Sequence, residues 1–385
     1  MSPQLIDSPD ALARLLDEIS TEPLLAMDTE AASFHRYHDR IYLIQISTAS
    51  STALIDPLGA GDLAGIGNLL ANPRVEKVFH DADYDLRLFD KAFGFHARRL
   101  FDTRIAAQFL NEPGIGLAAL LEKYLGVQVD KRFQRADWSI RPIPDPMLDY
   151  AASDTSHLYE LQLILRRSLQ EMGRLAWVDE ECLLLEGTRW SAPDVDPTTD
   201  FLRIKGARAL DRRALAILQE LYLWRTQLAD ATDRAEFRIM GNEVLLHLAR
   251  NPVDSAEDLR RVRGVGREIA ERRGRDVLGA IERGRNRPES ELPRIPRPPR
   301  RVSDPGFDTR LDALKHQRNA LAQRLDLAPG VVCPNGTLEA IARAEPDDLE
   351  ALGGVAGVRR WQVDVIGAQL LDAMHRSMPP LGKEV

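Results

Sequence analysis

Apolar and polar positions alternate in two different ways along this chain. Over the first 175 residues, short apolar segments bounded by turn residues predict strands, namely LLAMDTE, YLIQIST, TALIDP and VEKVFH. Residues 61–73, 81–94 and 145–172 have apolar positions at helical spacing, so each of these segments predicts one helix. Strands and helices that alternate in this way predict an α/β domain, in which helices flank a mixed sheet.

Strand signals end near residue 205, and two helical modules follow. Adding 93 to a position in the first module often gives the same residue in the second. Arg225 corresponds to Arg318, and the pattern V-x-G-V-x-R begins at Val262 and again at Val355. A fixed offset without gaps predicts a duplicated all-α domain. The stretch between the copies is rich in Pro and Arg and predicts an extended spacer.

These patterns predict a division of the chain into six segments. They are an α/β domain over residues 1–175, a connector over 176–206, a helical domain over 207–286, a linker over 287–306, a second helical domain over 307–378 and a tail over 379–385. No window approaches ~18 uninterrupted apolar residues, so we expect no membrane span. The two cysteines lie far apart without ligand-spaced partners, and no signal peptide is evident. We therefore expect a cytoplasmic protein without a thiolate zinc site.

The net charge of -8 conceals an asymmetry between the two halves of the chain. Residues 1–200 carry 19 Lys and Arg against 32 Asp and Glu, whereas residues 201–385 carry 32 against 27. Residues 260–301 hold 14 Arg and six acids. This asymmetry favours an anionic partner bound by the second half, although solvated helix surfaces would also carry such charge.

Acidic residues follow or end several of the predicted elements. Asp28 and Glu30 lie on the same side of a strand, where they repel each other unless they share a cation or a proton. Oxygen ligands favour magnesium or manganese. Asp85 begins a helix after a buried strand, and Tyr150 and Asp154 are four residues apart on one helical face. Taken singly, these residues would also suit an exposed strand end, a helix cap and an amphipathic helix.

The three segments that contain these acids, DTE, HDADYDL and YAASD, resemble the exonuclease motifs of the tyrosine-containing branch of the DEDD superfamily. The stretch LAALLEKYLGVQVDKRFQRADWSIRP resembles the segment before the third motif in the bacterial ribonuclease D family. The helical modules, with LYLWR and EDLRRVRGVG, resemble the HRDC domains that follow the nuclease domain in that family. The resemblance covers nearly the whole chain.

The resemblance implies an RNase H-like fold and hydrolysis with two divalent metal ions, Mg²⁺ or Mn²⁺. Asp28 would bridge both ions, Glu30 and Asp154 would complete one site, Asp85 would support the other through water, and Tyr150 would orient the attacking water. Asp85 is preferred to its neighbours Asp81 and Asp83 because we place it on the helix and them in the turn. The implied partner is RNA with a free 3′ end, above all tRNA precursors, shortened by a monomeric enzyme that releases 5′-mononucleotides.

Basic and aromatic residues extend the prediction to RNA contacts. The candidate phosphate ligands are Lys131, Arg141, Arg261, Arg263 and Arg267, although each would also suit a solvated surface. The family often has an aromatic residue directly after the first-motif Glu, whereas this chain has Ala31. In the family this aromatic residue can stack on the terminal base, and Phe34, His35 or Tyr37 could take its place here.

Two other functions remain open. A DNA-directed 3′→5′ exonuclease would use the same carboxylates, but nothing in the chain resembles a polymerase or helicase region. A catalytically inactive RNA-binding scaffold is disfavoured because all four acids and the tyrosine are present.

Overall fold

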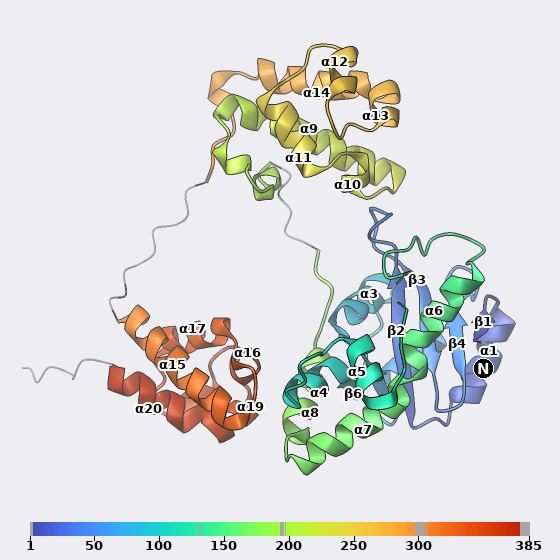
Figure 1. The fold of residues 1–385 in the computed structure, drawn as a ribbon, viewed down its shortest axis with the longest axis vertical. Coiled ribbons are helices and arrows are strands. Elements are labelled where there is room, and N and C mark those ends of the chain that lie inside the picture. The colour runs from blue at the N-terminus through green and yellow to red at the C-terminus, as the bar shows by residue number, and fades with distance from the viewer. Residues whose placement is uncertain are drawn as a thin grey trace, which may run out of the picture.

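A computed structural model describes residues 3–130, 132–192, 196, 198–296, 304 and 306–377. It contains an α/β domain and two helical domains, as predicted (Figure 1). The strands are β1 (Gln4–Ile6), β2 (Leu24–Ala31), β3 (Ile41–Ser47), β4 (Thr52–Ile55), β5 (Glu76–Phe79) and β6 (Leu100–Asp102). The helices of the α/β domain are α1 (Pro9–Ile19), α2 (Ala64–Ala71), α3 (Asp83–Phe93), α4 (Thr103–Phe109), α5 (Leu117–Leu125), α6 (Asp145–Ser156), α7 (Leu158–Glu171) and α8 (Leu175–Leu185).

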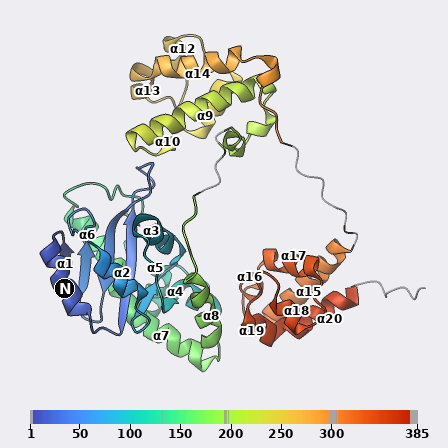
Figure 2. The same cartoon turned by 180° about the vertical axis from the view of Figure 1, so that it is seen from behind.

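The sheet is mixed, with strand order β1-β4-β3-β2-β5-β6. Strand β2 pairs with β3 in antiparallel and with β5 in parallel orientation, so the strand that carries Asp28 is held on both sides. Helix α6 covers one face of the sheet, and α2 lies over the other (Figures 1 and 2). The predicted strands are present, whereas β1 and β6 were not predicted, because three residues are too few to show an alternation.

The single helix predicted over residues 145–172 is wrong, because the helix is interrupted at His157. Helix α6 packs against β2, β3 and β4, whereas α7 packs against α4, α5 and β5. Buried Thr155 anchors the end of α6 through a 2.7 Å hydrogen bond between its hydroxyl and that of Ser47. We attribute the break to the twist of the sheet, since one straight helix cannot follow both contact surfaces.

The six α-helices of the first helical domain correspond in order to the six α-helices of the second, whereas the short 3-10 helices of the first have no counterpart among the described residues. The first contains η1 (Asp200–Arg203), η2 (Ala207–Ala209), α9 (Arg212–Thr232), α10 (Glu236–Ile239), α11 (Asn242–Arg250), α12 (Ala256–Arg261), α13 (Arg267–Arg272), α14 (Gly274–Asn286) and η3 (Glu289–Glu291). The second contains α15 (Phe307–Leu325), α16 (Pro329–Val332), α17 (Asn335–Ala344), α18 (Leu349–Gly353), α19 (Arg360–Gln362), the π-helical turn η4 (Val363–Gly367) and α20 (Ala368–Ser377). No helix among the described residues combines the length and the apolar character of a membrane span.

Buried arginines confirm the duplication in atomic detail. Arg225 donates hydrogen bonds to the Met240 carbonyl and the Asn242 side chain, and Arg318 repeats both bonds 93 residues later. The glycines of the repeated motif, Gly264 and Gly357, both adopt positive φ, at 93° and 86°. This turn requires glycine in each copy because a side chain would be strained there.

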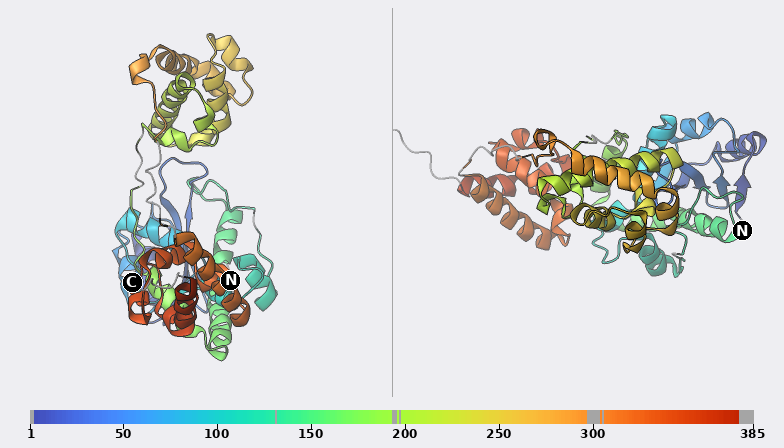
Figure 3. Two further views of the ribbon diagram at one scale, coloured as in Figure 1. Left: turned by 90° about the vertical axis from the view of Figure 1, so that its left-hand side faces the viewer. Right: turned by 90° about the horizontal axis from the view of Figure 1, so that it is seen from above.

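The second helical domain packs on the α/β domain through a cluster of aromatic rings. Trp361 stacks on Trp177 of α8 with ring centroids 5.0 Å apart, and its edge meets Phe109 of α4. The Glu180 carboxylate accepts a hydrogen bond from the Trp361 backbone amide, and Glu181 pairs with Arg359. The apolar cores of the two domains are continuous across this contact. In Figure 1, α19 faces α8, and in the left view of Figure 3 the second helical domain lies in front of the α/β domain.

The first helical domain has a core of its own and contacts the α/β domain through the loop between β2 and β3. The Ala235 amide donates to the His35 carbonyl at 3.0 Å, and the His38 amide donates to the Asp233 carboxylate at 2.9 Å. In Figures 1 and 2 this loop reaches toward α10. The domain therefore contacts the loop that directly follows the strand carrying Asp28 and Glu30.

Replacing Trp361 by Ala should lower the free energy of unfolding by roughly 3–5 kcal/mol, because the substitution empties a buried aromatic contact between two domains. Urea unfolding followed by circular dichroism measures the effect. Trp190→Ala is the control: Trp190 is 41% exposed, and we expect a change within about 0.5 kcal/mol. Equal losses for the two variants would contradict a stabilising role of the interface.

Candidate active site

Three carboxylates from two elements meet on one face of the sheet. Asp28 and Glu30 come from the end of β2, and Asp154 comes from α6, which covers that face. One oxygen atom from each residue lies within 4.8 Å of the others. Tyr150, one helical turn before Asp154, donates a hydrogen bond to the Asp154 carboxylate. The four predicted residues on β2 and α6 are thus together.

Asp85 completes the acidic cluster from α3. Its carboxylate is buried and accepts a hydrogen bond from the Thr29 hydroxyl, between Asp28 and Glu30 in the chain. Its neighbours turn away, since Asp83 pairs with Arg87 at 2.8 Å and Asp81 pairs with Arg104. Asp83 also lies on the helix and not in the preceding turn, so that part of the prediction is wrong. Burial, and not the helix itself, distinguishes Asp85.

Burial and mutual repulsion raise the pKa values of these acids, so they hold their protons to a higher pH than free carboxyl groups do. Burial, followed by the charges of neighbouring acids, raises the pKa of Asp28 and that of Glu30 well above their usual values. Burial also raises the pKa of Asp85 and that of Asp154 to about 7. Burial and the nearby Asp154 carboxylate raise the pKa of the Tyr150 hydroxyl, which therefore stays protonated at neutral pH.

The donor set fits a divalent cation. Neither Lys nor Arg is among the main causes that shift the pKa values of the four acids. Gln45 lies directly opposite Asp28 on β3, fully buried, and neither polar atom of its amide has a hydrogen-bond partner in the part of the chain that the structure describes. Uncompensated buried carboxylates with oxygen donors are suited to Mg²⁺ or Mn²⁺.

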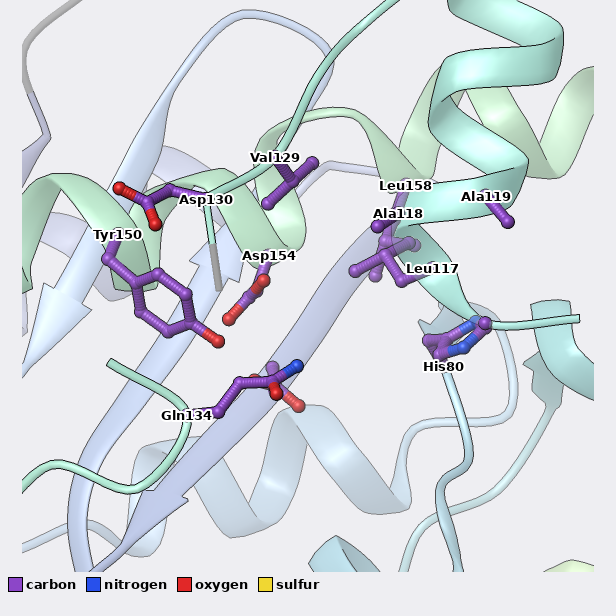
Figure 4. Close-up of a pocket in the computed structure, with 12 residues that line it drawn as sticks. His80, Leu117, Ala118, Ala119, Val129, Asp130, Gln134, Tyr150, Asp154 and Leu158 are labelled. Atoms are coloured by element: carbon purple, nitrogen blue, oxygen red, sulfur yellow. The ribbon is translucent and has the colours of Figure 1, made fainter. Parts of the chain in front are cut away.

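A cavity of about 360 Å³ opens over this cluster. Asp28, Tyr150 and Asp154 line it together with Gln134 and His80 (Figure 4). The Tyr150 hydroxyl and the Asp154 carboxylate point into the same space as the Gln134 amide, while His80 lies on the opposite side (Figure 4). Our sequence analysis did not identify Gln134, because a single Gln in a polar loop carries no periodic signal.

Of the two phosphate contacts predicted near the cavity, the one at Arg141 conflicts with the hydrogen bonds that this side chain makes. Arg141 uses all five of its N–H donors internally, on Asp56 and on the carbonyls of Tyr42, Trp138 and Ile140. It has no donor left for a phosphate, so its predicted role is wrong, and Arg141 instead fixes the loop before α6. Lys131 lies outside the described residues.

The three arginines predicted in the first helical domain remain exposed. Arg261 pairs with Glu257 and Asp258, and Arg267 pairs with Glu271. Arg263 is exposed and forms no ion pair among the described residues. Exposed pairs of this kind are weak, so their arginines can exchange a carboxylate for a phosphate at little cost.

In the metal-free protein, Asp154→Asn should raise stability at pH 8 and leave it unchanged at pH 4. The unfolded chain releases the Asp154 proton near pH 4, whereas the folded chain keeps it up to about pH 7. Wild-type stability therefore falls as the pH rises through this window, and the Asn side chain avoids that loss. We expect a gain of at least about 1 kcal/mol at pH 8.

Thermal unfolding in EDTA at both pH values measures this gain. The control is Asp149→Asn, on the exposed side of the same helix, which should change nothing. A gain for Asp154→Asn that is equal at pH 4 and pH 8 would contradict the raised pKa.

Comparisons with known proteins agree with this geometry. Residues 3–170 match the 3'-5' exonuclease family, and residues 214–281 and 307–374 match the HRDC domain family. Ribonuclease D of Granulibacter bethesdensis is 34% identical over 96% of this chain and 92% of its own length. The crystal structure of Escherichia coli RNase D superposes with a TM-score of 0.67 at 27% identity and covers 98% of this chain and 99% of its own. A Bifidobacterium adolescentis protein superposes with a TM-score of 0.79 at 27% identity over 97% of each chain. This chain therefore belongs to the ribonuclease D family of 3′→5′ exoribonucleases.

Proposed function

We propose that this enzyme shortens structured RNAs, tRNA precursors among them, from the 3′ end and releases 5′-mononucleotides with the help of two divalent ions, Mg²⁺ or Mn²⁺. The observation that carries the proposal is the convergence of Asp28, Glu30, Asp85 and Asp154 beside Tyr150 at one cavity. The E. coli relative is described as an exoribonuclease involved in structured RNA processing, which supports the substrate class.

The carboxylates would hold the ions in an unequal way. The charges of Asp85, Glu30 and Asp154 all raise the pKa of Asp28, so this carboxylate is close to each of the other three, and it would be the one shared between two ions. Glu30 and Asp154 would complete one site, and Asp85 would support the other. Two ions bound there would activate a water molecule and stabilise the charge on the leaving 3′ oxygen.

Tyr150 would orient the attacking water and would not act as a base. Because its pKa is raised, its hydroxyl keeps its proton and can only donate or accept hydrogen bonds at neutral pH. The ring is held by Phe133 and Trp138, with centroids 5.9 Å and 6.1 Å away, and the hydroxyl is directed by Asp154. A tyrosine whose ring and hydroxyl are both held in place keeps the water bound to that hydroxyl in one position, which favours in-line attack.

We also infer that the enzyme acts in the cytoplasm as a monomer. The two cysteines are buried and unpaired, which suits a reducing compartment. All of the site residues proposed above come from one chain, so catalysis needs no second copy.

The function is tested by incubating the full-length chain with 3′-labelled RNA and with DNA of the same sequence, in Mg²⁺, Mn²⁺ or EDTA. We expect 5′-mononucleotides from RNA with either metal and none in EDTA. Asp28→Asn should lower the rate by at least about 100-fold, because electrostatic stabilisation by a metal site supplies several kcal/mol. Preferred cleavage of DNA would favour the proofreading type of nuclease. RNA binding without cleavage would favour a scaffold.

The exposed arginines of HRDC domain 1 (residues 214–281) should contribute the salt-dependent part of RNA binding. Each lost phosphate contact lowers the salt slope of binding by roughly 0.7–0.9, so Arg263→Ala and Arg267→Ala should each have this effect on the binding of a tRNA precursor. The control is Arg360→Ala, the position in the second copy that corresponds to Arg267, where the backbone amide donates a hydrogen bond to Glu180 of the α/β domain. Equal slopes for all variants would assign these arginines to the solvated surface alone.

A further inference from the structure

Exposed aromatic rings gather where HRDC domain 1 meets the α/β domain. Phe34, in the loop after β2, is 44% exposed, and Phe237 of α10 is 55% exposed. The two rings meet edge to face with centroids 6.3 Å apart. A pair of aromatic rings that served only to join two domains would be buried, whereas these two keep about half of their surface open to solvent.

The surrounding contacts hold this pair in place. Arg238 donates a 2.6 Å hydrogen bond to the Phe34 carbonyl, and the guanidinium of Arg135 lies 5.0 Å above the Phe34 ring. The Nε2–H group of His35 donates a 3.0 Å hydrogen bond to the Arg135 carbonyl. Phe34 is therefore held by a residue of HRDC domain 1 and by the loop that follows α5, and its ring in turn contacts Phe237.

This pair lies near the catalytic cavity but does not line it. Phe34 is four residues after Glu30, so its Cα lies within roughly 14 Å of the Glu30 Cα. Arg135, which covers Phe34, is the neighbour of the cavity residue Gln134. On the other side, Tyr84 bonds to Ser33 at 2.8 Å and precedes Asp85.

The second copy of the repeat lacks this feature. The position that corresponds to Phe237 is Gly330, in a helix that contributes no residue to the lining of the cavity. The aromatic side chain is therefore a property of the copy that touches the active-site loop, and not a requirement of the HRDC fold.

We propose that Phe34 and Phe237, with Arg135, form a base-stacking platform that receives the nucleotides just upstream of the 3′ end of the RNA. The proposal rests on the proposed function. Aromatic faces bind any base by stacking and so suit an enzyme that must accept a changing sequence as it shortens its substrate. The guanidinium groups of Arg135 and Arg238 provide the positive charge that the RNA backbone requires. HRDC domain 1 thus contributes a ring to the substrate channel.

The test uses a 12-nucleotide RNA with the fluorescent base 2-aminopurine at the third position from its 3′ end. Binding is measured in the full-length chain that carries Asp28→Asn, so that the RNA stays intact. Stacking should quench the fluorescence on binding. Phe34→Leu and Phe237→Leu keep the apolar volume and lose the aromatic face. Each should abolish most of the quenching and weaken binding by roughly 5- to 100-fold, without a change in salt slope, since no phosphate contact is lost.

Two further variants make the result specific. Phe237→Trp should retain quenching and affinity, because it restores an aromatic face. Trp190 is a comparably exposed ring, with the ammonium group of Lys91 5.5 Å from its centroid. The Trp190→Leu variant removes this ring and should bind the RNA as the parent does. Thermal unfolding of each variant confirms that it is folded.

Unchanged quenching and affinity in Phe34→Leu and Phe237→Leu would overturn the platform, and so would a loss of affinity accompanied by a lower salt slope. These outcomes differ from a failure of the proposed function. If the parent chain binds and quenches the probe but the unmodified enzyme hydrolyses no RNA, the platform stands and the nuclease assignment fails.

Discussion

The repulsion among four carboxylates at the end of β2 is the constraint on which the rest of the structure depends. Buried acids without a cation destabilise the fold, so every element that carries one must be held by contacts elsewhere. Strand β2 is paired on both edges, α6 is anchored through Thr155 and Ser47, and α3 is tied to β2 through Thr29. The unfavourable free energy of bringing the four acids together is thus offset by contacts formed during folding, and the ions would bind to carboxylates that are already in position.

Much of this arrangement could be predicted from the sequence, because strands and helices with a regular spacing of apolar residues can be recognised from that spacing. Strands β2 to β5 and helix α3 follow the apolar pattern. The choice of Asp85 could also have been made on periodicity alone. It lies four residues before buried Phe89 and therefore on the inner face of α3, whereas Asp83 is four residues before exposed Arg87. The same argument could not identify β1 and β6, which are too short, or the break at His157, which depends on what each half of the helix packs against.

Contacts that depend on distant partners could not be predicted. Arg141 looked like a phosphate ligand in a basic stretch, but its partner Asp56 is 85 residues away in sequence. Gln45 stands out only weakly in the sequence, as the single amide in an apolar strand. That it lies beside the acidic cluster follows from the pairing of β2 with β3, which places it opposite Asp28. The buried arginines of the HRDC domains were visible only because the 93-residue offset repeats them. Repetition supplied the evidence that a single sequence otherwise lacks.

The two HRDC copies show how one fold acquires two roles through the residues on two faces. Position 361 of the second copy is a buried Trp that packs on Trp177, whereas the corresponding Glu268 is exposed and pairs with Arg234. Position 237 of the first copy is an exposed Phe, and its counterpart is Gly330. A face that is buried against the α/β domain cannot also bind RNA. The copy that packs through its α19 face is tied to the α/β domain. The other copy leaves its α13 face and arginines open to solvent, and its Phe237 on α10, in contact with Phe34, keeps about half of its surface accessible to a substrate.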